Sequence, residues 1–178
     1  MADLRSELRA ATSASHIEIE KNPRLSKLLS GTLDFDSYID VLARYYGFFK
    51  PMENALAPHI SEADLKTPAL AADLHDFDLS KTPLAADLPS LSSRGSIFGA
   101  LYVLEGSAMG GVQIAKHLAQ FPFTEGRRSF FVSDGAAVSF RWKSFLARLA
   151  ELSESEWPDA CTSAVRTFSF LDTWMAGS

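Results

Sequence analysis

Residues 101–111 of the chain read LYVLEGSAMGG, and they lie in a segment whose apolar spacing predicts one long helix from about Ser93 to Gln120. Three of the ten glycines in the chain fall within six of these residues. Each glycine in a helix interior costs about 0.8–1.0 kcal/mol relative to alanine. A helix that keeps three glycines so close together therefore needs a compensating interaction.

Two interpretations of these glycines are open at the level of sequence. Gly106 and Gly110 are four residues apart, so they share one helix face on which the backbone is open to close approach. Another helix could pack against this face, or a flat ligand could lie directly on it. The additional Gly111, with Ser107 beside the groove, favours a kinked helix over a ligand.

The rest of the chain also shows helical spacing, and the alternation typical of strands is scarce. We therefore expect an all-α fold of six to eight helices, with residues 1–178 forming a single domain. The other expected helices run from Asp3 to Asn22, from Asp34 or Asp36 to about Met52, from Thr67 to about Asp76, from Ala136 to Leu152, and from about Ser153 to Met175. Pro51 is expected to kink or end its helix, and residues 130–132 are a possible extended piece.

Composition excludes several classes of function. Seventeen basic and 22 acidic residues give a net charge of −5 without any Lys/Arg block, which disfavours general nucleic-acid binding. The single cysteine, Cys161, excludes an intramolecular disulfide and any cysteine-built zinc or iron–sulfur site in one chain. There is no export signal and no apolar run of the ~20 residues that a membrane span needs. We therefore expect a cytoplasmic protein with neither nucleic acid nor membrane as a partner.

Four histidines are candidates for binding a metal. His59 and His75 fall in or near loops, and His117 follows the glycines near a helix end. His16 differs because Arg9 lies two turns earlier on nearly the same helix face. That geometry suits an iron ligand and a partner for a carboxylate of the same bound molecule.

Motifs for other chemistries are absent from the sequence. It contains no HExxH, no P-loop, no GxSxG elbow and no GxGxxG after a strand. The Glu-x-x-His motifs of di-iron bundles are also missing.

Four segments together resemble the heme oxygenase family, and they occur in the family's order over most of the chain. Residues 8–16, LRAATSASH, resemble its proximal helix, and residues 101–111 resemble its distal helix, whose glycines let the backbone lie over heme. Residues 142–146, WKSFL, resemble the segment that supplies a basic residue to a heme propionate. Residues 165–168, VRTF, resemble the last helix, which closes the pocket with an aromatic side chain. The compact bacterial type is most similar, including enzymes that make chromophore for bacteriophytochromes.

The resemblance implies that heme is both cofactor and substrate, held between the first helix and the glycine-rich distal helix. Ring opening would consume O2 and electrons from a reductase or ferredoxin and would release biliverdin, carbon monoxide and ferrous iron. A bacteriophytochrome is a possible receiver of the bilin. The implied site residues are His16 as axial ligand, Gly106, Gly110 and Ser107 as the catalytic distal surface, Gly111 beside it, Arg9 and Lys143 for the propionates, and Tyr102 and Phe168 as pocket walls.

Two positions depart from the animal-type pattern. Ser107 stands where those members carry an aspartate that organises water, and Ala147 stands where they carry an arginine. Two other functions therefore stay open at this point. The chain could store, deliver or sense heme without cleaving it, or it could be a heme-free helical domain whose glycines serve only packing.

Overall fold

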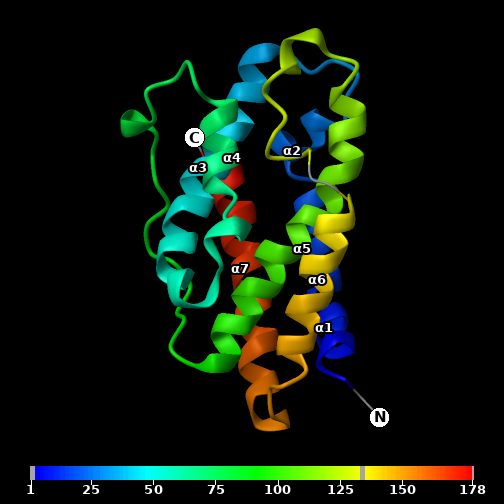
Figure 1. Ribbon diagram of the computed structural model, residues 1–178, viewed down its shortest axis with the longest axis vertical. Coiled ribbons are helices and arrows are strands. Elements are labelled where there is room, and N and C mark those ends of the chain that lie inside the picture. Colours follow the sequence, from blue (N-terminus) through cyan, green and yellow to red (C-terminus); the bar gives the residue numbers. More distant parts are fainter. Residues whose placement is uncertain (1–2, 133–134, 178) are drawn as a thin grey trace.

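The computed structural model describes residues 3–132 and 135–177, and within these ranges the chain is all-helical, with no strand (Figure 1). Its α-helices in those ranges are α1 (Leu4–Glu20), α2 (Pro23–Leu28), α3 (Phe35–Leu56), α4 (Thr67–Asp73), α5 (Arg94–Leu118), α6 (Gly135–Leu149) and α7 (Trp157–Ala176). Short 3-10 turns connect several of them. The all-α prediction is confirmed, whereas the single-domain assignment stays a prediction.

Local capping signals place the helix starts. The Asp3 carboxylate accepts the Ser6 N–H at 3.0 Å, and the Asp34 carboxylate accepts the Ser37 N–H at 2.8 Å. Ser93 opens α5 with a capping box. Because such caps satisfy backbone donors that have no partner inside the helix, they act over three residues and can be read from sequence.

Pro51 does not end α3, which continues to Leu56. A proline lacks the N–H that would bond the carbonyl four residues earlier, here that of Gly47. The Ala85 N–H donates to this carbonyl at 2.9 Å instead. The alternative that Pro51 ends the helix is therefore wrong, because a distant loop supplies the missing donor, and the alternative that it kinks the helix stays a prediction.

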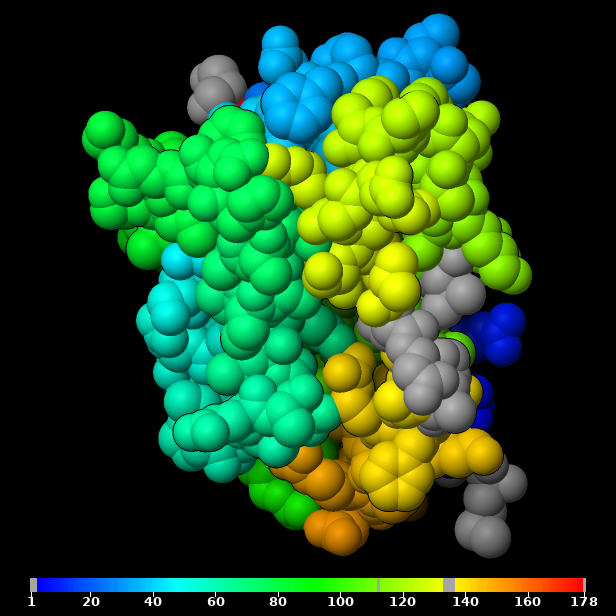
Figure 2. All heavy atoms as spheres, turned by 45° about the horizontal axis from the view of Figure 1, so that its top comes forward, coloured from blue at the N-terminus to red at the C-terminus, as the bar shows by residue number. Residues whose placement is uncertain are grey.

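Other boundaries also differ from the sequence-based expectation. Helix α6 ends at Leu149 rather than Leu152, α7 begins at Trp157 rather than near Ser153, and α2 was not among the expected helices. Helix α4 ends at Asp73 rather than near Asp76. Residues 130–132 form no extended piece, because the N–H groups of Phe131 and Val132 both donate to the Arg128 carbonyl in a turn. In Figure 2 the segment that contains this turn lies beside residues 66–80, where the Asp73 carboxylate accepts the Phe130 N–H at 2.8 Å.

Helices α5 and α7 pack most closely against each other, with α1 against α7 and α6 against α5 (Figure 1). The start of α5 meets α7 through Gly95 and Gly99. A Cβ added at Gly99 would overlap the Ala160 carbonyl oxygen, and one added at Gly95 would overlap that of Glu156. Across the same contact the Ser163 hydroxyl donates to the Ser96 carbonyl at 2.6 Å. Close backbone contact therefore fixes how these two helices cross.

Helix α5 is also the one helix in the described part of the chain that is long and apolar enough to cross a membrane. This statement rests only on the length and the composition of the helix. The core helix of a globular protein passes the same test, and α5 contacts both α6 and α7.

Candidate functional site

A cleft of about 580 Å³ lies between the end of α1, helix α2 and the second half of α5. Its volume is in the range of small-molecule sites. The lining is mostly apolar and consists of Ile19, Glu20, Leu25, Ser26, Leu28, Leu29, Tyr45, Met109, Gly110, Gln113 and Ile114. Leu29 is 57% exposed and Met109 is 48% exposed, so the cleft presents apolar surface that a flat apolar ligand would cover.

The glycines of α5 distinguish the two interpretations left open by the sequence. A Cβ added at Gly106 or Gly110 would meet no atom within 4 Å among the described residues. Within the described residues no helix therefore packs closely against Gly106 or Gly110, and the helix-packing interpretation does not hold for these two glycines there. Gly111 is different, because its Cβ would lie 3.5 Å from the Phe131 carbonyl oxygen, away from the open face. Helix α5 runs unbroken through all three glycines, and the expected kink stays a prediction.

His16 lies on α1, one turn before the cleft residues Ile19 and Glu20. Its ring centroid is 4.4 Å from that of the buried Phe168 on α7, which supports one side of the imidazole. Burial lowers the pKa of His16, and the nearby Glu20 carboxylate opposes this effect. Neutral imidazole is the form that ligates a metal, so this environment suits an axial ligand.

The other histidines are engaged elsewhere. The His117 ring contacts the Ser30 carbonyl at 3.2 Å, and the exposed His75 lies 3.3 Å from a carboxylate oxygen of Asp76. His59 lines a different cavity. His16 lies within a turn of cleft-lining residues on α1, and His117 lies within a turn of the cleft-lining residues Gln113 and Ile114 on α5.

Ser107 is half-buried, and its hydroxyl donates to the Leu104 carbonyl at 2.6 Å. Its single proton is therefore used inside the helix, while its oxygen can still accept a hydrogen bond. Ser107 also lines a small cavity of about 60 Å³ that adjoins the cleft.

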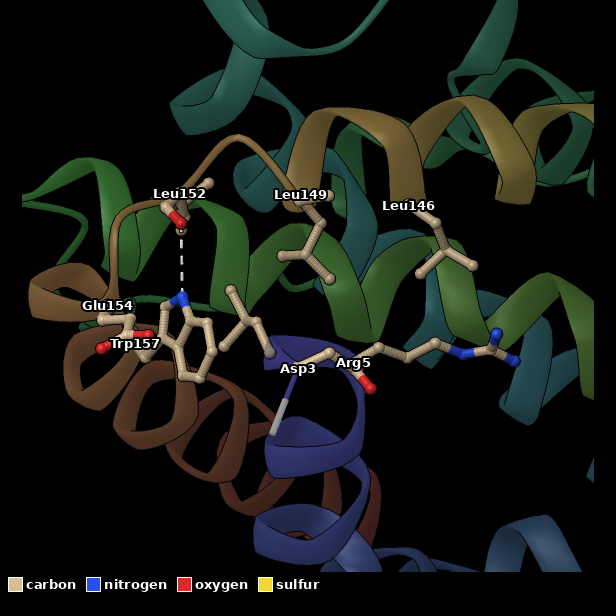
Figure 3. Close-up of a pocket in the computed structure, with 9 residues that line it drawn as sticks. Asp3, Arg5, Leu146, Leu149, Leu152, Glu154 and Trp157 are labelled. Atoms are coloured by element: carbon tan, nitrogen blue, oxygen red, sulfur yellow. Dashed lines mark hydrogen bonds between the residues drawn. The ribbon is translucent and has the colours of Figure 1, made fainter. Parts of the chain in front are cut away.

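Arg9 on α1 and Lys143 on α6 are both exposed. In Figure 3, Arg5 of α1 and Leu146 of α6 line the same cavity. The two helices run in opposite directions (Figure 1). The expected roles of Arg9 and Lys143 as partners of the propionates stay predictions.

Tyr102 lies one turn before Gly106 on the same face of α5. Its side chain is buried, and its ring centroid is 5.7 Å from that of Trp142 on α6. Tyr102 lines neither the cleft nor the small cavity that adjoins it, so its role as a pocket wall stays a prediction.

The cavity in Figure 3 is separate from these residues. It encloses about 380 Å³ between the start of α1, the end of α6 and the start of α7. Leucines and Trp157 line it, and the Trp157 indole N–H donates to the Leu152 carbonyl at 3.3 Å. None of the predicted site residues lines it.

Sequence reasoning missed Glu20, Tyr45 and Lys66, which line the cleft or the adjoining small cavity. The spacing of Glu20, four residues after His16, is a signal that could have been read. Tyr45 and Lys66 have no comparable signal, because other segments of the chain bring them to α5.

Comparisons with known proteins identify the family and the fold. The family model "Heme oxygenase" matches residues 2–176. The fold is similar to that of the heme oxygenase from Neisseria meningitidis solved with NO and CO bound, with a TM-score of 0.76 and 22% identity over 98% of this chain and 91% of the other. It is also similar to heme oxygenase-1 from the cyanobacterium Synechocystis in complex with heme, with a TM-score of 0.74, 16% identity and the same two coverages. No curated protein sequence matches the chain.

The chain belongs to the heme oxygenase family. It is therefore a heme-binding oxidoreductase that degrades heme to biliverdin. Heme storage, delivery or sensing without cleavage is not favoured.

Proposed function

We propose that heme lies in the cleft between α1 and the Gly106–Gly110 face of α5, with His16 as its axial ligand. The observation that carries this proposal is the open space over Gly106 and Gly110. This space lies next to the cleft, and the α1 residues that line the cleft begin at Ile19, one turn after His16. Heme is flat and largely apolar, which matches an open backbone surface bordered by exposed Leu29 and Met109. Bound heme supplies an iron centre that takes up electrons and activates O2.

The distal residues act by leaving space. Gly106 and Gly110 present only backbone, and among the described residues no atom lies within 4 Å of a Cβ added at either position. A porphyrin on this face would therefore keep an unobstructed edge. Ser107 orients one water molecule through its oxygen, since its proton is held by the Leu104 carbonyl.

Charged residues at the edge fix the orientation of the ring. Arg9 and Lys143 neutralise the two propionates, where exposed ion pairs add little affinity but select one placement. Phe168 holds the His16 imidazole, Tyr102 closes the α6 side, and Gly111 lets the segment at Phe131 approach α5.

The proposed partners follow from the reaction. Electrons come from a reductase or ferredoxin, O2 is the oxidant, and carbon monoxide and ferrous iron leave with biliverdin. We place the enzyme in the cytoplasm and name a bacteriophytochrome as a possible receiver of the bilin.

A hemin titration of wild type, His16→Ala and His75→Ala tests the ligand. His16→Ala is expected to shift the Soret band and change the spin state, because the axial nitrogen is lost while α1 stays folded. His75→Ala, which removes an exposed histidine, is expected to match wild type. An unchanged spectrum for His16→Ala would reject the assignment and make His117 the next candidate.

Adding an electron donor and oxygen to the hemin complex of the wild type should then yield biliverdin.

A further inference from the structure

The small cavity that Ser107 lines is a direct neighbour of the cleft, because some residues line both spaces. Tyr45, Gly110 and Ile114 line both spaces. The cavity volume of about 60 Å³ gives room for a few water molecules. Lys66 and Ser107 line the cavity but not the cleft. A lysine therefore lies next to the distal surface, although the proposed roles above do not use it.

Lys66 is a buried charge with only 9% of its surface exposed. The Glu53 carboxylate accepts its backbone N–H at 2.5 Å and so fixes the residue at the start of α4. Burial lowers the pKa of the ammonium, and the positive charge of Arg141 lowers it further. The carboxylates of Glu105, Asp64 and Glu53 act in the opposite direction. Burying an ammonium group costs free energy, so we expect its position at the cavity wall to have a functional role.

Behind Lys66 a cluster of charges reaches solvent. The Arg141 Nε lies 3.6 Å from Asp64 Oδ1 and 3.8 Å from Glu105 Oε2. Among the described residues, Arg141 Nε and Nη2 are buried without a direct hydrogen-bond partner. Charged groups at such separations are commonly bridged by water. The Asp64 side chain is 30% exposed and lines an adjacent cavity of about 450 Å³, so protons can enter from that side.

The other polar groups of the small cavity do not supply a charged donor. The Ser107 hydroxyl donates to the Leu104 carbonyl. Burial raises the pKa of Tyr45, which keeps its phenol neutral. Among the described residues no carboxylate pairs directly with the Lys66 ammonium, so its N–H groups can point to water in the cavity.

We propose that the Lys66 ammonium, rather than an acidic side chain, holds the water from which ring opening draws its proton. The inference rests on the function proposed above. One cavity water gives up a proton toward the heme side, and a solvent proton replaces it through water around Asp64, Arg141 and Glu105. Lys66 acts through water and is therefore a positioning residue.

The test compares Lys66→Met, Lys66→Arg and the exposed control Lys81→Met. Methionine keeps the apolar stem and removes the charge, so urea denaturation of the apoprotein should show a fold at least as stable as wild type. Two measurements follow: the pH midpoint of the acid-to-alkaline change in the visible spectrum of the ferric heme complex, and the single-turnover rate of biliverdin formation.

Lys66→Met is expected to raise the spectral midpoint and to slow biliverdin formation about tenfold or more, because a charged hydrogen-bond donor is lost. Lys66→Arg should restore most of both quantities, and Lys81→Met should change neither. A Lys66→Met protein with the wild-type midpoint and rate would overturn the inference, as would an arginine variant no better than methionine. If wild type binds hemin but forms no biliverdin, the proposed function fails instead, and the midpoint still tests Lys66.

Discussion

The two halves of α5 use the same residue type at the same spacing for opposite purposes. Gly95 and Gly99 are four residues apart, and each faces backbone of α7 where no side-chain atom would fit. Gly106 and Gly110 are also four residues apart, and added Cβ atoms there would meet nothing within 4 Å in the described part of the chain. The i,i+4 spacing of glycines therefore indicates an open backbone face but does not say what occupies it.

The energetic consequences differ accordingly. In the first half, contact with α7 compensates for the low helix propensity of glycine, since the backbones approach closely enough for Ser163 to donate to the Ser96 carbonyl. In the second half, none of the described residues makes a close contact that compensates for Gly106 and Gly110. The ligand proposed for this face would offset their cost when it is bound.

The largest effect is expected for Gly99→Ala. The new Cβ overlaps the Ala160 carbonyl oxygen and lies 2.9 Å from the Ala164 nitrogen, so α5 and α7 must separate. We expect a loss of about 3 kcal/mol or more in the free energy of unfolding, measured by urea denaturation of the apoprotein.

Gly106→Ala is the matched control for that variant. Its Cβ enters open space, so the apoprotein should gain up to about 1 kcal/mol from better helix propensity. Equal destabilisation by the two alanines would contradict the difference between the halves of α5.

Gly110→Leu is expected to leave the circular dichroism of the apoprotein unchanged and to reduce the biliverdin rate more than about tenfold. The side chain would occupy the space that the porphyrin face and O2 require. Hemin binding should weaken but persist, because His16 is untouched. Wild-type turnover in this variant would show that the open face is not the distal surface.

Ser107→Ala should slow single turnover about two- to twelvefold, the effect of one neutral hydrogen bond of about 0.5–1.5 kcal/mol. The Leu104 carbonyl holds the serine proton, so only an acceptor is lost. Complete loss of biliverdin would make Ser107 an indispensable proton relay. An unchanged rate would remove it from the site.

Glu105→Gln tests how the mostly buried carboxylate beside the glycines of α5 affects the pH dependence of stability. Burial raises the pKa of Glu105 above its usual value, so the folded protein binds this proton more tightly than the unfolded chain does. Stability from this group is present at pH values below about 4.5 and is lost as pH rises through the raised pKa. The glutamine variant should therefore be more stable than wild type at pH 7, by a margin that shrinks toward pH 4.5.

The exposed Glu125→Gln is the control for this measurement and should show no such trend in urea denaturation. A glutamine variant of Glu105 that loses stability at pH 7 would mean that its pairing with Arg141 outweighs the cost of burial.

The sequence by itself determined the all-α class, the starts of several helices and the family. Caps such as Asp3, Asp34 and Ser93 act within three residues, so local chemistry was sufficient. The distal-helix motif around Gly106 likewise identified the family before any contact was known, and the family model agrees.

Only the tertiary structure decided which glycines face a helix and which face open space, because that depends on where α7 and α1 lie relative to α5. It also decided that Pro51 stays helical, since the compensating N–H comes from Ala85. Lys66 is the clearest case. Nothing near it in sequence predicts burial, and its environment is built by Glu53, Glu105 and Arg141 from three other helices, whose charges interact through space rather than along the chain.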